Sequence, residues 1–80
     1  MIEHKGRLDL APKASGATVS FEKEVPSTEY QMGLSVISEK PTKVQIDIVK
    51  IVKKEKGFRV FFNKEVPGRF WKLHYHVVHS

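Results

Sequence analysis

The chain has 80 residues and a formal net charge of +5, which limits it to a single small, basic domain over residues 1–80. It contains no cysteine, so disulfide bonds, cysteine-based zinc sites and thiol redox chemistry are excluded. A domain of this size buries only ~60% of the surface of its unfolded chain, so we expect it to gain stability by forming a homo-oligomer.

Apolar and polar residues alternate along the first half of the chain, where the pattern predicts three strands. The first covers residues 1–10 and is an edge strand. The second covers residues 17–23, and the third begins at Tyr30 and ends near Val36. A period of two is typical of half-buried strands, because successive side chains point to opposite faces of the sheet.

The second half predicts three longer strands, over residues 43–54, 58–64 and 69–79. Gly57 and the Pro67-Gly68 pair stand where the chain has to reverse. One face of these strands forms the predicted core: Val44, Ile46, Ile48, Phe58, Val60, Phe62, Trp71, Leu73, Tyr75 and Val77. Because no segment has a helical period, we expect an all-β fold, a six-stranded antiparallel β-sandwich.

Further apolar residues fall on the opposite face of these strands if the alternation is unbroken. A β-bulge near Ile48 and Val49 would move some of them to the core face. Otherwise this second face is too apolar for a small monomer to expose. We then expect a subunit interface formed by Ile51, Phe61, Phe70 and Val78.

The sequence carries no arrangement of residues that supports catalysis. It has no glycine-rich phosphate loop, no nucleophile elbow and no recognisable cofactor motif. His74 and His76 lie two apart on a strand, a spacing that could ligate zinc or nickel with His4 or a second subunit. A polar outer face explains the same spacing, so we predict a non-enzymatic protein with no metal and no cofactor.

Basic charge is concentrated in the second half of the chain. Residues 1–40 hold five basic and six acidic side chains, whereas residues 41–80 hold nine and three. Such asymmetry can indicate a nucleic-acid or anionic partner. Four lysines gather at one predicted turn, however, and are better interpreted as solvated groups that protect a strand edge: Lys50, Lys53, Lys54 and Lys56. Nucleic acid is therefore not the favoured partner.

Hydrogen-bond donors and an aromatic ring are expected together on the outward face of the last two strands. The short EVPG connection predicts that these strands pair as a hairpin. That pairing would place five side chains on one surface: Arg59, Phe61, Lys72, His74 and His76. Because sugars combine hydroxyl groups with an apolar C–H face, this surface is the predicted ligand site. A solvated or subunit-facing strand is the alternative.

No apolar stretch approaches the ~20 residues that cross a bilayer, and no membrane partner is expected. The first residues, MIEHKGR, lack the apolar run of a signal peptide. We therefore expect the protein in a cytoplasm or in a particle assembled there.

Spaced aromatic, glycine and proline residues then suggest a family. Phe21 ends an early strand, Pro26 follows in a bend, Tyr30 opens the next strand, Gly57-Phe58 begins another, and Trp71 opens the last. In this order, residues 17–78 resemble the H-type lectin-like β-sandwich and the related modules of bacteriophage tail fibres and receptor-binding proteins. The chain is shorter than these lectins and lacks their cysteines.

The resemblance implies a trimer or hexamer that recognises carbohydrate near subunit junctions. It implies a bacteriophage tail-associated structural or host-adhesion module, located in the virion or, before assembly, in the host cytoplasm. The expected partners are other phage tail proteins and host cell-wall carbohydrate. A free carbohydrate-binding lectin-like domain and a basic nucleic-acid-binding β-barrel remain alternatives.

Overall fold

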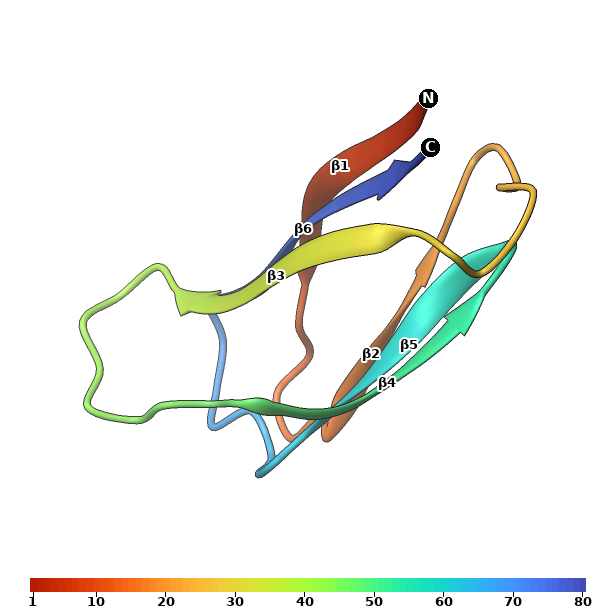
Figure 1. Cartoon of the computed structure of the whole chain (residues 1–80). Helices are drawn as coiled ribbons and strands as arrows, with labels where there is room; N and C mark the ends of the chain where they lie inside the picture. Colours follow the sequence, from red (N-terminus) through yellow and green to blue (C-terminus); the bar gives the residue numbers. More distant parts are fainter.

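The computed structural model describes residues 1–80 and contains six β-strands and no helix (Figure 1). The strands are β1 (Ile2–Asp9), β2 (Gly16–Ser20), β3 (Gln31–Ser38), β4 (Ile48–Lys54), β5 (Gly57–Phe62) and β6 (Trp71–His79). The all-β prediction is confirmed. Each predicted strand is present, with ends that differ by a few residues from those expected.

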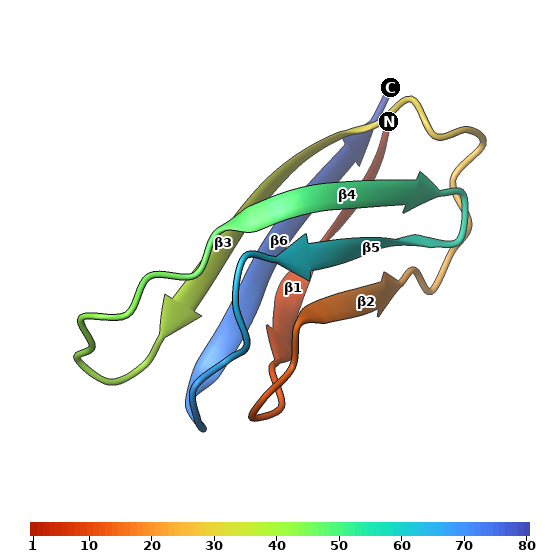
Figure 2. The ribbon, with the colours of Figure 1, turned by 90° about the horizontal axis from the view of Figure 1, so that it is seen from below.

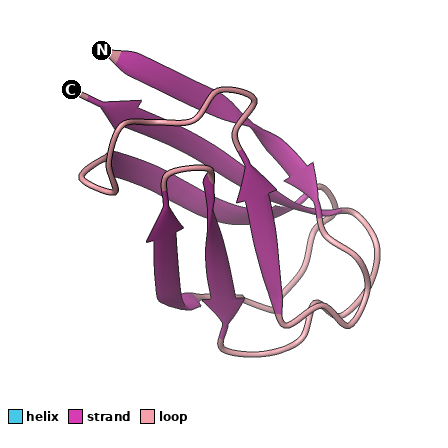
Figure 3. Ribbon diagram, turned by 90° about the vertical axis from the view of Figure 1, so that its right-hand side faces the viewer, coloured by secondary structure: helices cyan, strands magenta, loops and turns pink.

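The strands form two three-stranded sheets, with the orders β1–β6–β3 and β2–β5–β4. Every pairing is antiparallel. The sheets pack face to face in a sandwich-like arrangement, and loops make all the connections (Figure 3). Because β1 pairs with β6 in the register Ile2 opposite His79, the two chain ends lie side by side.

The core lies between the two sheets and contains most of the predicted apolar face. Six buried side chains of the predicted set are contributed by β5 and β6: Phe58, Val60, Phe62, Trp71, Leu73 and Val77. Tyr75 is half-buried and packs against this cluster. From the other strands, alternate residues of β1 and β3 turn the same way, so every strand gives one face to the core.

An aromatic chain links the sheets at the end where the chain termini lie. The ring of Phe21, just after β2, stacks on His4 at a centroid distance of 4.5 Å. Phe21 also lies 5.7 Å from Tyr30 and 6.0 Å from Phe58, and Phe58 lies 5.8 Å from Tyr75. Edge-to-face and offset contacts at these distances are favourable for aromatic rings, so they fix the packing of one sheet on the other.

The fourth strand begins later than predicted and contains a bulge, which the sequence leaves open as the alternative to an apolar subunit interface. It starts at Ile48, and the register with β5 shifts between Ile48 and Lys50, which leaves Val49 as the extra residue. The shift places Ile51 opposite the buried Val60, so Ile51 belongs to the inner side of the sheet and not to the outer face. Val44 precedes the strand and is exposed, contrary to its predicted place in the core.

The segment between β5 and β6 is not a hairpin turn. It carries the chain from one sheet to the other, so β5 and β6 are not neighbours. Val66 is completely buried in this segment, and its N–H donates to the carbonyl oxygen of Ala14 while its own carbonyl accepts from the N–H of Lys13. The EVPG segment thus pairs with the loop after β1, and the predicted pairing of the last two strands is wrong.

Candidate functional site

The five predicted ligand residues do not share a surface. Arg59 and Phe61 lie on the outer face of the β2–β5–β4 sheet, where Thr18 is opposite Arg59. The other three lie on the outer face of the β1–β6–β3 sheet: Lys72, His74 and His76. Since the core separates the two outer faces, one chain cannot use all five residues on a single ligand.

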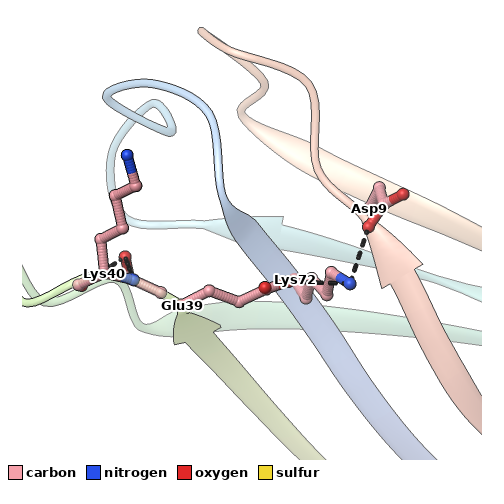
Figure 4. Close-up of polar contacts among 5 residues, drawn as sticks. Asp9, Glu39, Lys40 and Lys72 are labelled. Atoms are coloured by element: carbon pink, nitrogen blue, oxygen red, sulfur yellow. Dashed lines mark hydrogen bonds and ion pairs between the residues drawn. The ribbon is translucent and has the colours of Figure 1, made fainter.

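The outer face of the β1–β6–β3 sheet carries two groups of paired charges, together with Lys5 and Arg7, which form no ion pair. Lys72 lies between two carboxylates, with its Nζ 2.7 Å from Glu39 and 3.5 Å from Asp9 (Figure 4). Its hydrogen bond to Glu39 and the charge of that carboxylate, supplemented by Asp9, raise the pKa of Lys72 above its ordinary value of 10.5. The amine therefore stays charged and held in place at neutral pH.

A second pair lies on the same face, nearer the chain termini. Nε2 of His76 is 2.7 Å from a carboxylate oxygen of Glu3. This hydrogen bond and the charge of His76 hold the pKa of Glu3 below its ordinary value of 4.5. His74 lies on β6 between Lys72 and His76, opposite Arg7 of β1 and Ser35 of β3.

The histidines do not assemble into a metal site within one chain. His4 belongs to the inner side of β1, stacked on Phe21, whereas His74 and His76 belong to the outer side of β6. His79 is 2.9 Å from the hydroxyl of Ser27. No group of three or more His, Asp or Glu side chains is placed to hold a metal ion.

One end of the molecule displays an aromatic side chain in a strained conformation. Phe70, the residue before β6, has a φ of 71°, in the left-handed region that a bulky side chain rarely adopts. Its side chain is 49% exposed. The carbonyl oxygen of Phe70 accepts a hydrogen bond from the N–H of Glu39 at 2.7 Å, which fixes this conformation against the end of β3.

Polar groups of both charges surround Phe70. Nζ of Lys40 lies 4.0 Å from the centre of its ring. A hollow of about 370 Å³ beside it is lined on its polar side by Asp9, Glu39, Arg69 and Lys72. Figure 4 shows Lys72 reaching between Asp9 and Glu39 while Lys40 points away from them. Residues 69–72 and the adjoining part of this hollow are called the Phe70 end below.

The Phe70 end has the chemistry of a sugar-binding site. An exposed ring offers a surface to the C–H groups of a saccharide, and carboxylates and amines at fixed positions can bind its hydroxyl groups. Strained backbone that the surrounding structure holds in place occurs often at ligand sites. Sequence reasoning assigned Lys72 to a ligand site and Phe70 to a subunit interface. It missed Asp9 and Glu39, because their approach to Lys72 depends on β6 lying between β1 and β3.

The four residues expected at a subunit interface are dispersed over the molecule. Phe61 lies on one outer face and Val78, opposite Glu3, on the strand at the centre of the other sheet. Ile51 lies on the edge strand β4, and Phe70 lies at one end. A single flat interface therefore cannot bury all four, although separate contacts in a closed ring can.

Comparison with known proteins gives this chain no family assignment. It matches no protein-family model, no curated protein sequence and no solved structure. No helix in the molecule could serve as a membrane span. The class that the fold defines is an all-β domain of two three-stranded antiparallel sheets.

Proposed function

We propose that this chain is a non-enzymatic, carbohydrate-binding adhesion module that recognises its ligand at the Phe70 end. The observation that carries the proposal is the exposed, strained Phe70 ring beside the charged groups of Asp9, Glu39 and Lys72. An aromatic ring held in solvent, on a residue with an unfavourable φ, adds no stability to the core of the protein. A ligand that covers the ring supplies the missing stabilisation.

The proposed module belongs to the H-type lectin-like β-sandwiches found on bacteriophage tails. Two three-stranded antiparallel sheets support this assignment, together with the order of Phe21, Tyr30, Phe58 and Trp71 along the chain. In this proposal the protein is a homo-oligomeric tail component, and the ligand is a carbohydrate of the host cell wall. Its activity would be adhesion, with no covalent step.

A printed array of uncharged oligosaccharides tests the proposal. We expect the wild-type protein to bind a subset of the array and the Phe70→Asn variant to lose that binding. Asn tolerates the left-handed conformation, so this change removes the ring without adding strain. A matched control is Val49→Asn, which removes an apolar side chain that is 64% exposed elsewhere. Absence of any binding by the wild type, or equal loss in the control, would contradict the proposal.

A further inference from the structure

The outer face of the β2–β5–β4 sheet carries cations that have no anionic partner. In the register of this sheet Lys50 is opposite Phe61, Arg59 is opposite Thr18 and Lys54 is opposite Gly57 (Figure 2 shows this sheet in front). None of the three cations takes part in an ion pair, whereas Lys72 on the other sheet has two partners. Their charge is thus directed to solvent and available to a ligand.

Phe61 keeps two of these cations in place. The guanidinium carbon of Arg59 lies 4.9 Å from the centre of its ring, and Nζ of Lys50 lies 5.6 Å from it. Contacts of this kind are attractive because the ring face is electron-rich. Phe61 therefore orders two of the cations on this face.

A hollow of about 360 Å³ lies beside the cations. Its lining includes Thr18, Ser20, Lys54, Lys56, Gly57 and Arg59. Gly57 is required at this position, because a Cβ there would collide with the carbonyl oxygen of Val19. The cations and the hydroxyl groups line the same hollow.

The two hydroxyl groups in this hollow are unused by the protein. No side-chain hydrogen bond involves Thr18 or Ser20. They lie on β2, opposite Arg59 and Gly57 of the central strand β5. The lysines of β4 lie on the other side of β5. Hydroxyl groups opposite cations suit a ligand that has both sugar hydroxyls and negative charges.

We propose that this face binds an acidic polysaccharide, whose anionic groups contact Lys54 and Arg59 and whose hydroxyl groups contact Thr18 and Ser20. This site goes beyond the proposed function. It lies on a different surface from the Phe70 end and recognises charge, so either site can fail without the other. Single-stranded nucleic acid is the competing ligand, and it offers fewer hydroxyl groups per charge to Thr18 and Ser20 than a polysaccharide does.

Binding of the native protein to dextran sulfate and to uncharged dextran tests this proposal, because the two polymers share a glucose chain and differ in the sulfate esters that replace part of its hydroxyl groups. We expect binding to dextran sulfate and none to dextran at an ionic strength of about 0.15 M, where exposed charges are screened beyond ~8 Å. The double variant Lys54→Gln/Arg59→Gln should weaken binding at least ~10-fold, because it removes two charge-assisted contacts. Its matched control is Lys5→Gln/Arg7→Gln, which removes the same charge from the other sheet and should leave the affinity almost unchanged.

Three results would overturn the proposal. One is equal weakening by the two double variants, which would mean that only net charge matters. Another is tighter binding to a thymidine oligonucleotide than to dextran sulfate, which would identify nucleic acid as the ligand. The third is unchanged affinity for dextran sulfate in Thr18→Val/Ser20→Ala, since a sugar ligand should need these hydroxyl groups. A several-fold loss in that variant supports the sugar contact.

Discussion

Tyr30 shows how a single hydroxyl group joins the two sheets. It precedes β3 and is 2% exposed, yet its hydroxyl donates to the carbonyl oxygens of Lys54 and Gly57 in the β4–β5 hairpin of the other sheet. The same oxygen accepts from the N–H of Lys54 at 3.2 Å. Burial raises the pKa of Tyr30 above its ordinary value of 10.0, partly offset by that N–H. The stabilisation is therefore fully present below pH 10.0 and is lost as the pH rises through the raised value.

We expect Tyr30→Phe to lower the free energy of unfolding by about 1–3 kcal/mol, because it leaves buried backbone groups of Lys54 and Gly57 without a partner. Urea denaturation measures this change. Tyr75→Phe is the control, since no hydrogen bond in the protein involves that hydroxyl, and it should cost less than ~0.5 kcal/mol. Equal losses in the two variants would show that the bonds of Tyr30 have no special weight.

Phe70 should be replaceable without loss of stability. Relief of its left-handed backbone by Phe70→Asn offsets the lost contact with Lys40, so we expect a change within about 1 kcal/mol in the free energy of unfolding. Phe58→Ala, in the core, should cost about 3–5 kcal/mol by comparison. A comparable cost at Phe70 would mean that the ring is needed for folding and would weaken its assignment to ligand binding.

The Glu3–His76 pair predicts a small acid sensitivity. Because the pKa of Glu3 is lowered in the folded protein, its contribution is present above about pH 4.5 and is lost as the pH falls through the lowered value. Thermal unfolding temperatures of wild type and Glu3→Gln should therefore differ at about pH 5.5 and converge as the pH falls below the lowered pKa of Glu3. Both groups are exposed, so we expect a shift of only a few degrees. A difference that is constant with pH would rule out the ion pair as its source.

At the scale of the strands, alternation of apolar residues was sufficient to predict all six elements. It also identified the buried side of β5 and β6, because a period of two residues on a half-buried sheet specifies which side chains face the core. The partner of each strand was not readable. The EVPG segment has the composition of a turn, but Val66 within it is fully buried and the chain crosses to the other sheet.

The candidate site was less accessible to sequence reasoning than the fold. The sequence was enough to assign Lys72 to an outward face. It was not enough to identify the carboxylate partners of Lys72, because Asp9 and Glu39 are far from it in the sequence. The positive φ of Phe70 has no signature in its residue type, since glycine or asparagine is the usual choice there. The bulge at Val49 was predictable because the apolar residues of β4 exceed one face.

The bulge should be removable without turning β4 over. Deleting Val49 would give an unbroken ladder in which Ile48 stays opposite Phe62 and Lys50 opposite Phe61, so Ile46 and Ile48 keep their burial. We therefore expect the deletion to cost less than the ~1.5–3 kcal/mol that exposing one such side chain would cost, measured by urea denaturation. A loss of that size for each side chain would mean that the residues before the bulge have turned out of the core and would contradict this register.

At the scale of the whole molecule, the two outer faces differ in charge. The β1–β6–β3 face mixes acidic and basic side chains and holds the three ion pairs of the protein, whereas Lys50, Lys54 and Arg59 on the β2–β5–β4 face form none. The Phe70 end adjoins the β1–β6–β3 face, where ion-paired Lys72 lies beside the exposed ring. Two distinct ligand surfaces on one small domain are therefore compatible with the same fold.

Exposed apolar residues also favour assembly of several chains. Large side chains are exposed at Ile37, Val44 and Phe70 near one end and at Val49 and Ile51 on the edge strand β4. Edge strands with apolar side chains tend to pair with other chains. We expect light scattering to report three or six times the mass of one chain, and a monomer at every accessible concentration would contradict this expectation.

The most direct test of the account is an amide NMR titration of the labelled protein with the oligosaccharide that binds most strongly on the array. If the Phe70 end is the binding site, the largest shift changes should occur at residues 38–40 and 69–72, which lie together through the hydrogen bond between Glu39 and Phe70. Changes confined to β4 and β5, or to the strand ends near the chain termini, would contradict it.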